Sequence, residues 1–206
     1  DELMPHFSEK TRYNIRLAAR KGVTVHWSRS EEDLKKFFDL YEITAVRDKI
    51  GHRPYEYFKR MVDAYGSSDL LRIYIAEHEG EPFSGAICIH YGNKTWYIYG
   101  ASSNNKRNLM PNYAMQAEMI RWGFENGSKI YDFGGVFILD KTNGLYKFKE
   151  GFCRREGATE FIGEFDLVYN PLLYTGFAKV LPMVQRRRNR KHQQESVQPA
   201  PKQEKE

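Results

Sequence analysis

Residues 71–99 read LRIYIAEHEGEPFSGAICIHYGNKTWYIY, and this stretch decides the fold class. It is rich in Ile, Tyr and Trp, which favour strands, and it contains two turn signals, EGEP at 79–82 and GN at 92–93. Three strands separated by two short turns form an antiparallel meander. The predicted strands are Leu71–Glu77, Gly85–Tyr91 and Thr95–Tyr99.

Upstream of the meander the pattern is helical. The start and stop signals predict helices at Ser8–Lys21, at Glu31–Lys49 and from Pro54 through Ala64. The second of these helices has an apolar face made of Leu34, Phe37, Phe38, Tyr41 and Val46.

Downstream, the signals predict a helix from Pro111 to about Glu125 and a short helix at Leu145–Lys149. They also predict a short buried strand at Ile130–Phe133 and a further strand at Phe161–Val168. Helices packed on a mixed, mostly antiparallel sheet give an α/β (α+β) layer fold.

The net charge of +5 comes mainly from the end of the chain. From Gln185 onward there are seven Lys or Arg and three Glu, or 7 − 3 = +4, which leaves 25 − 24 = +1 for the rest. The tail 185–206 has almost no apolar side chains and is expected to be disordered. The segment 171–184 before it is amphipathic, and its basic flank favours peripheral contact with an anionic membrane surface.

The sequence also allows predictions of the cellular location, of the state of the cysteines and of metal or cofactor binding. No run of about 18 apolar residues and no charged-then-apolar leader occurs, so the expected location is cytoplasmic, with peripheral contact at the inner membrane face. Cys88 and Cys153 are expected to be reduced thiols, a single disulfide being the alternative. The histidines and cysteines lack metal-ligand spacing and no phosphate-binding glycine loop occurs, so no metal and no cofactor is expected.

A long polar loop with two adjacent cations, Lys106 and Arg107, leads into the helix that Pro111 opens. Free amide N–H groups at a helix N-terminus, together with two cations, make a site for phosphate or carboxylate. The alternative interpretation is a solvated connection with incidental charges.

Two glycine-containing stretches carry candidate catalytic groups. In YDFGG at 131–135, Asp132 at a strand end is suited to orient an amine or accept a proton, or it is a turn-forming Asp. In GLYKFKEGF at 144–152, a partly desolvated Lys beside Phe148 is suited to stabilise an oxyanion in acyl transfer. The alternative for the second stretch is a surface lysine pair, Lys147 and Lys149.

The first predicted helix carries Arg12, Arg16 and Arg20 at spacings i, i+4 and i+8. Such a stripe indicates a polyanionic partner, or else a solvated helix face.

Five stretches occur together and in order: KTRYNIR at 10–16, YGASS at 99–103, RNLMPNY at 107–113, YDFGG at 131–135 and LYKFKEGF at 145–152. Taken together they resemble the Fem family of peptidoglycan aminoacyltransferases, over about Lys10 to Asp166. The resemblance implies a GNAT-like acyltransferase domain. It also implies transfer of an amino acid from aminoacyl-tRNA to the stem-peptide amine of a peptidoglycan precursor, either lipid-linked or UDP-linked.

The resemblance also implies roles for the candidate residues. Lys149, Phe148 and Asp132 would lie at the reaction centre, with Lys149 stabilising the oxyanion. Substrate binding would fall to Lys106, Arg107, Asn112, Tyr113, Tyr99 and Lys147. The stripe of Arg12, Arg16 and Arg20 would meet tRNA phosphates.

The same resemblance divides the chain. It implies a connecting helix from a missing N-terminal domain at 1–22 and the GNAT-like domain at 23–170. The composition sets apart the amphipathic segment at 171–184 and the basic tail at 185–206. The missing domain contributes part of the precursor site in the family, so the isolated chain is expected to be inactive or to need a partner chain. The alternative is a non-catalytic half-domain that binds a complementary subunit or the membrane surface.

Overall fold

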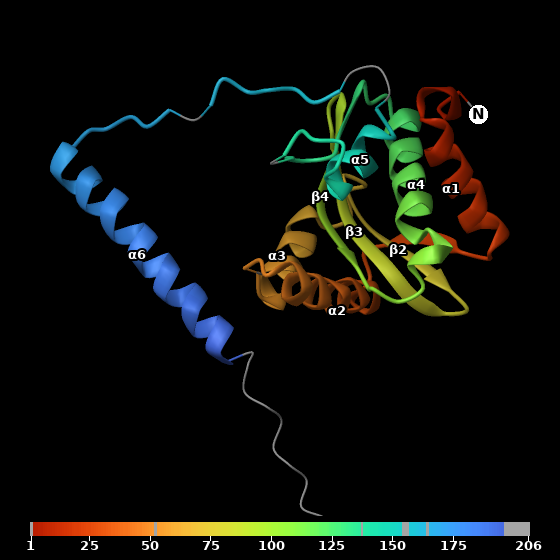
Figure 1. Cartoon of the computed structure of the whole chain (residues 1–206). Coiled ribbons are helices and arrows are strands. Elements are labelled where there is room, and N and C mark those ends of the chain that lie inside the picture. Colours follow the sequence, from red (N-terminus) through yellow and green to blue (C-terminus); the bar gives the residue numbers. More distant parts are fainter. Residues whose placement is uncertain (1, 52, 137, 154–156, 164, 196–206) are drawn as a thin grey trace, which may run out of the picture. The chain divides into compact units, whose positions relative to one another are not determined.

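The computed structural model describes residues 2–51, 53–136, 138–153, 157–163 and 165–195, with side chains described through residue 187 (Figure 1). The chain divides into two compact units, Asp1–Thr159 and Glu160–Glu206. All the candidate site residues lie in the first unit.

The first unit is built on a five-stranded sheet in the order β1-β2-β3-β4-β5. Its strands are β1 (Thr24–Ser28), β2 (Leu71–His78), β3 (Glu81–Tyr91), β4 (Lys94–Ser102) and β5 (Ile130–Asp132). Neighbouring strands are antiparallel from β1 to β4, and β5 pairs with β4 in parallel. The three-strand meander and the mixed, mostly antiparallel sheet predicted from the sequence are therefore confirmed.

Helices cover both faces of this sheet (Figure 1). On one face, α2 (Glu31–Asp48) and α3 (Tyr55–Tyr65) pack on the strands through a cluster that includes Phe37, Phe58 and Ile73. On the other face lie α1 (Glu9–Arg20) and α4 (Pro111–Glu125), whose core includes Met115 and Met119. Side chains this deeply buried each contribute about 1.5–3 kcal/mol to folding.

Strand β4 contains a bulge that decides which side chains reach which face. Ile87 pairs with Tyr99 and Cys88 pairs with Tyr97, so Ile98 has no partner on β3. One extra residue reverses the alternation of side chains along a strand. As a result Tyr97 packs on the α1/α4 side of the sheet, whereas Tyr99 packs on the α2/α3 side.

The pairing between β4 and β5 is short. It joins Lys94–Trp96 to Ile130–Asp132 and ends there, while β4 continues to Ser102. Beyond β5 the chain makes a loop that leads to the short helix α5 (Gly144–Glu150). The loop and α5 carry the stretches that the sequence singled out as chemically active.

Several predictions for single elements were wrong. Strand β1 was not predicted from the sequence, and residues 161–163 and 165–168 form no strand but are exposed. Val46 is 76% exposed and does not belong to the apolar face of α2. The strand at Ile130 is partly exposed rather than buried.

The second unit contains the α-helix α6 (Pro171–Glu195). This helix continues past the amphipathic segment into residues 185–195, which were expected to be disordered; the rest of the predicted tail, 196–206, lies outside the described residues. Two 3-10 turns in the first unit, η1 (Met4–His6) and η2 (Arg107–Leu109), complete the described elements. Within the described part of the chain, no helix is long and apolar enough to cross a bilayer.

Candidate functional site

Helix α5 is held in place at both of its ends. At its start, the Asn143 side chain accepts hydrogen bonds from the N–H groups of Leu145 and Tyr146, both at 3.0 Å. At its end, the N–H of Ser8 donates to the carbonyl oxygen of Gly151 at 2.8 Å. A Cβ at Gly151 would lie 2.3 Å from Thr11 Oγ1, so only glycine lets α1 dock this closely. The helix is thus a fixed platform for the lysines that it carries.

Lys149 is 8% exposed, which is rare for a lysine. Its Nζ donates to the carbonyl oxygen of Gly135 at 3.0 Å and, at 3.4 Å, to that of Gly134. Burial lowers the pKa of Lys149, and the charge of Asp132 acts in the opposite direction. The cation is therefore held by neutral carbonyl groups, and among the described residues no carboxylate forms an ion pair with it.

Asp132 fixes the loop that presents those carbonyl groups. Its carboxylate accepts hydrogen bonds from Lys94 Nζ at 2.7 Å, from Trp96 Nε1 at 2.9 Å and from the N–H of Gly134 at 2.7 Å. Burial raises the pKa of Asp132, but these hydrogen bonds outweigh it and hold the pKa below its usual range. With three donors bound, the carboxylate is better suited to position the loop than to take a proton.

We predict that Asp132→Asn lowers the free energy of unfolding by about 1–2 kcal/mol at pH 7, because a hydrogen-bonded charge is lost. The folded-state pKa is depressed, so this contribution is present above the unfolded pKa of about 3.9 and is lost as the pH falls through the folded pKa. Urea unfolding at pH 7 and pH 3 measures it. Glu42→Gln, at an exposed site on α2, is the control.

If Asp132→Asn lowered the free energy of unfolding equally at pH 7 and pH 3, the prediction would be contradicted. The side chain would then stabilise the loop by its shape alone.

Phe148 and Tyr113 belong to a cluster of rings that joins α5 to α4 and to the segment before α1. The Tyr113 ring lies 5.0 Å from Phe148 and stacks at 5.8 Å on Phe152, measured between centroids. Phe152 in turn contacts Phe7 and Phe133 at 5.3 and 5.5 Å. The structure therefore brings together the predicted catalytic residue Phe148 and the predicted substrate-binding residue Tyr113, and both rings are half-buried.

A surface cleft of about 420 Å³ opens beside this cluster. Helix α1 contributes Lys10 to it, and α5 contributes Lys147 and Phe148. Its complete lining is Ser8, Lys10, Thr11, Tyr113, Lys141, Gly144, Lys147, Phe148, Glu150 and Gly151. Three lysines against a single carboxylate make this cleft suited to an anion.

The other predicted substrate-binding cations lie elsewhere. Lys106 sits over the Phe83 ring and faces Glu81 at 3.6 Å and Glu79 at 4.0 Å, at the turn between β2 and β3. Arg107 is exposed, and Asn112 is half-buried at the start of α4. None of these three predicted residues lines the cleft.

Tyr99 lies on the α2/α3 side of the sheet, beside Tyr57 and Arg53, which were not among the predicted site residues. Its hydroxyl donates to the hydroxyl of Tyr57 at 3.1 Å, and burial, assisted by Tyr57, raises the pKa of Tyr99 to about 12. The guanidinium of Arg53 lies 5.2 Å from the centroid of the Tyr57 ring. The stretch RPYEYF at 53–58 places an Arg and two Tyr around a helix start, and this pattern could have identified the polar neighbours of Tyr99.

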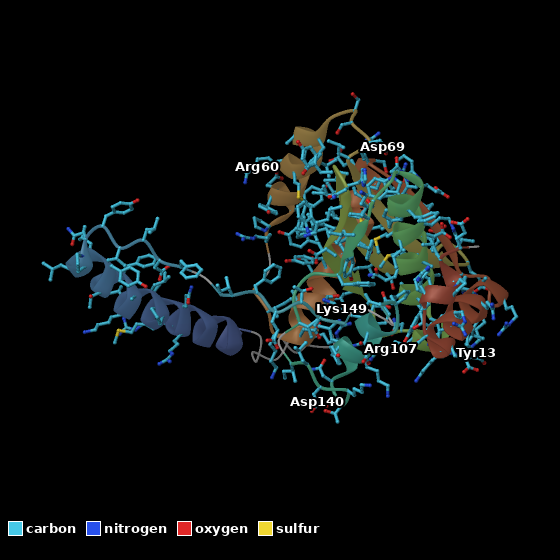
Figure 2. The ribbon with its side chains drawn as sticks, turned by 90° about the horizontal axis from the view of Figure 1, so that it is seen from above. Tyr13, Arg60, Asp69, Arg107, Asp140 and Lys149 are labelled. Carbon is cyan, nitrogen blue, oxygen red and sulfur yellow. The ribbon has the colours of Figure 1, made fainter. Side chains whose placement is uncertain are left out.

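The arginine stripe on α1 separates into two parts. Arg12 is half-buried and donates to the carbonyl oxygen of Phe7 at 2.6 Å, so it holds the start of the helix. Arg16 and Arg20 are exposed, and the guanidinium of Arg20 lies 5.8 Å from the Tyr13 ring. In Figure 2, Tyr13 points away from the body of the protein on the outer side of α1.

Comparison with solved structures supports the fold assignment. The crystal structure of FemX covers 74% of this chain with a TM-score of 0.66 and 26% identity, and the match spans 55% of that chain. The aminoglycoside acetyltransferase AAC(6')-Iy covers 71% with a TM-score of 0.54 and 13% identity, which is a likeness of fold alone. The predicted GNAT-like fold is confirmed.

Comparison of sequences identifies the family. The UDP-N-acetylmuramoylpentapeptide-lysine N(6)-alanyltransferase of Weissella viridescens is 39% identical over 84% of this chain, and the lipid II:glycine glycyltransferase of Staphylococcus epidermidis is 31% identical over 88%. The chain spans 51% and 59% of the lengths of these two relatives. The FemAB family model matches residues 1–80 and 73–181. The chain therefore belongs to the FemAB family.

Proposed function

We propose that this chain provides the acyl-transfer site of an enzyme that moves an amino acid from aminoacyl-tRNA to the stem-peptide amine of a peptidoglycan precursor. The observation that carries the proposal is the buried Lys149 ammonium, held by the carbonyl groups of Gly134 and Gly135. The names of the two relatives supply the acceptor class, a lipid-linked or nucleotide-linked precursor. The tRNA donor follows from the resemblance of the five sequence stretches to Fem enzymes.

The reaction needs an electrostatic centre rather than a nucleophile. The acceptor amine attacks the carbonyl carbon of the aminoacyl ester, so that a C–N bond forms and an oxyanion develops. Lys149 would stabilise this oxyanion as a preorganised cation. The C–O bond to the ribose then breaks, and the proton released by the amine ends on the ribose hydroxyl. Positioning the two reactants supplies much of the remaining rate.

The roles of the neighbouring groups follow from their contacts. Phe148 would form the apolar wall beside the reacting carbonyl, because its ring is fixed against Tyr113 and Phe152. Asp132 would act as a positioning residue, because it anchors the loop that holds Lys149. Tyr99, together with Tyr57 and Arg53, would provide a polar contact for the precursor.

A transfer assay tests this proposal. The chain is incubated with tRNAs charged with labelled amino acids and with a UDP-linked or lipid-linked precursor, and the mass of the precursor is measured. Appearance of a precursor carrying one added aminoacyl group supports the proposal. A chain that transfers only after a complementary subunit is added would be a half-enzyme, and one that never transfers would be the non-catalytic binding module.

We also propose that α6 contacts an anionic membrane surface, where a lipid-linked acceptor would be found. Its apolar side chains are exposed, among them Leu172, Phe177 and Val184. The exposed cations Arg186 and Arg187 follow directly. Basic residues beside an apolar helix face contribute about 1 kcal/mol each to binding at an anionic surface.

Deleting residues 185–206 is expected to abolish salt-sensitive binding to liposomes that contain anionic lipid. Co-sedimentation at low and high salt measures the binding, and liposomes of neutral lipid are the control. Equal binding by the parent and the deleted chain would refute the membrane role of the basic flank.

A further inference from the structure

Lys149 and Asp132 are close enough to interact, but they form no ion pair. The charge of Asp132 favours the protonated form of Lys149, whereas burial lowers the pKa of this lysine. The Lys149 Nζ is nevertheless bound to the carbonyl oxygens of Gly134 and Gly135, at 3.4 and 3.0 Å. Other groups therefore occupy the Asp132 carboxylate.

Lys94 and Trp96 occupy one oxygen of this carboxylate. The Lys94 Nζ lies 2.7 Å from Asp132 Oδ2, and the two side chains are 28% and 31% exposed. Salt screens a partly buried pair of this kind less than a surface pair. The Trp96 Nε1 donates to the same oxygen at 2.9 Å, and its ring lies 4.4 Å from the Lys94 Nζ. Because the N–H of Gly134 binds the other oxygen at 2.7 Å, the carboxylate is held away from Lys149.

The sheet brings Lys94 to this position from a distant part of the chain. Lys94 begins β4 and Asp132 ends β5, and the parallel register pairs Lys94 with Ile130 and Trp96 with Asp132. Residues two apart on a strand point to the same face, so Lys94 and Trp96 lie on the same side of the sheet as Asp132. The ion pair therefore forms only when β5 adds to β4.

The other ionisable groups beside Lys149 and Asp132 do not take over this role. Tyr131 packs on the α1/α4 side of the sheet, and burial raises its pKa, so it is uncharged. The Cys153 Sγ donates to the carbonyl oxygen of Lys149 at 3.3 Å and not to its ammonium group. Glu150 faces Lys141 at 3.6 Å. None of these described groups offers a counter-charge to the ammonium group.

We propose that Lys94 is a positioning residue for acyl transfer, which holds the Asp132 carboxylate so that it anchors the loop and does not neutralise Lys149. The inference rests on the proposed function, because it concerns the cation that would stabilise the oxyanion. Without Lys94, the Asp132 carboxylate would be free to pair with Lys149. A cation that is paired with a carboxylate stabilises a developing negative charge less, because the carboxylate cancels part of its field.

The first test follows the charge of Lys149 by NMR and needs no activity. The whole chain is labelled with ¹³C- and ¹⁵N-lysine, and the Lys149 side-chain signal, identified by its loss in Lys149→Arg, is followed against pH. In Lys94→Met, the pH at which Lys149 loses its proton is expected to rise by about one pH unit, because an unpaired opposite charge favours the charged form.

Two controls accompany this titration. Lys94→Arg keeps the cation, so Lys149 is expected to titrate as in the parent. Lys129→Met removes an exposed lysine directly before β5 and should also leave the titration of Lys149 unchanged. If Lys94→Met does not fold, Lys94→Gln replaces it with the same expectation.

The second test measures transfer, with the partner chain added if transfer needs it. Lys94→Met is expected to lower kcat by about tenfold, the factor that corresponds to one pH unit, with little change in KM. Adding Asp132→Asn to Lys94→Met is expected to restore most of kcat, because the carboxylate that would pair with Lys149 is gone. A residue that only supports the fold would give losses that add in the double variant.

The two tests separate this inference from the proposed function. An unchanged titration of Lys149 in Lys94→Met would overturn the inference, as would a double variant that is no more active than Lys94→Met. A shifted titration in an enzyme that loses no kcat in Lys149→Ala would confirm the charge arrangement and refute the catalytic role alone.

Discussion

Lys149→Ala is expected to lower kcat for aminoacyl transfer by about 10²–10³-fold, the loss typical of removing one oxyanion donor. The precursor affinity is expected to change less than about twofold, because an interaction that forms only in the transition state lowers kcat and leaves substrate binding alone. The structural reason is that Lys149 is tied to the carbonyl groups of Gly134 and Gly135, so its position is set before any substrate arrives.

Two further variants make this prediction specific. Lys149→Met keeps the length and burial of the side chain without its charge, so it separates charge from packing. Lys129→Ala removes an exposed lysine and should leave kcat unchanged. Lys149→Met with parental kcat would show that the side chain only supports the loop, and the catalytic role would then be withdrawn.

Gly100→Ala is expected to lower the free energy of unfolding by about 3 kcal/mol, at the upper end for overpacking a folded interior. A Cβ at this position would lie 1.5 Å from the hydroxyl oxygen of Tyr97 and 2.3 Å from its Cζ. The bulge at Ile98 puts Tyr97 and Gly100 on the same face of β4, so the ring cannot stay where it is. Urea denaturation measures the effect.

The control for this change is Gly51→Ala, where a Cβ would meet nothing within 4 Å. In a Tyr97→Ala background the cost of Gly100→Ala should disappear, which a double-mutant cycle detects. Full additivity of the two substitutions would contradict the steric explanation.

The meander and α5 could be predicted from sequence because their signals are local. Strand-forming residues and the EGEP and GN turns lie within 71–99, and α5 is framed by Asn143 and Gly151. The bulge could not be predicted in this way. The bulge depends on the register between β3 and β4, in which Ile87 pairs with Tyr99 and Cys88 pairs with Tyr97.

In the candidate site, too, local features could be predicted from the sequence, and contacts between distant segments could not. The stretch around Lys149 was found by its composition, but the partners of Asp132 were not, because Lys94 and Trp96 reach it through the parallel pairing of β4 with β5. The cations Lys106 and Arg107 looked like an anion site because they precede a helix. The sequence could not show that Lys106 faces two carboxylates at the distant β2–β3 turn.

The expected strand at Phe161–Val168 failed for a related reason. Its alternation of apolar residues is suited to a strand, but a strand also needs a neighbour that supplies hydrogen bonds. In the described part of this segment, Phe161 is 86% exposed and Leu167 is 79% exposed. The alternation of apolar residues alone was therefore not sufficient to predict a strand here.

The central claim is that the chain carries an acyl-transfer centre which uses an aminoacyl-tRNA donor. The most direct measurement is the mass of the precursor after incubation with the chain and one labelled aminoacyl-tRNA, with acetyl-CoA as the alternative donor. With a partner chain that supplies the missing domain, we expect a precursor heavier by one aminoacyl group from the charged tRNA, no product after the donor is deacylated, and none with acetyl-CoA. Product from acetyl-CoA, or the same yield from Lys149→Met as from the parent, would contradict the account.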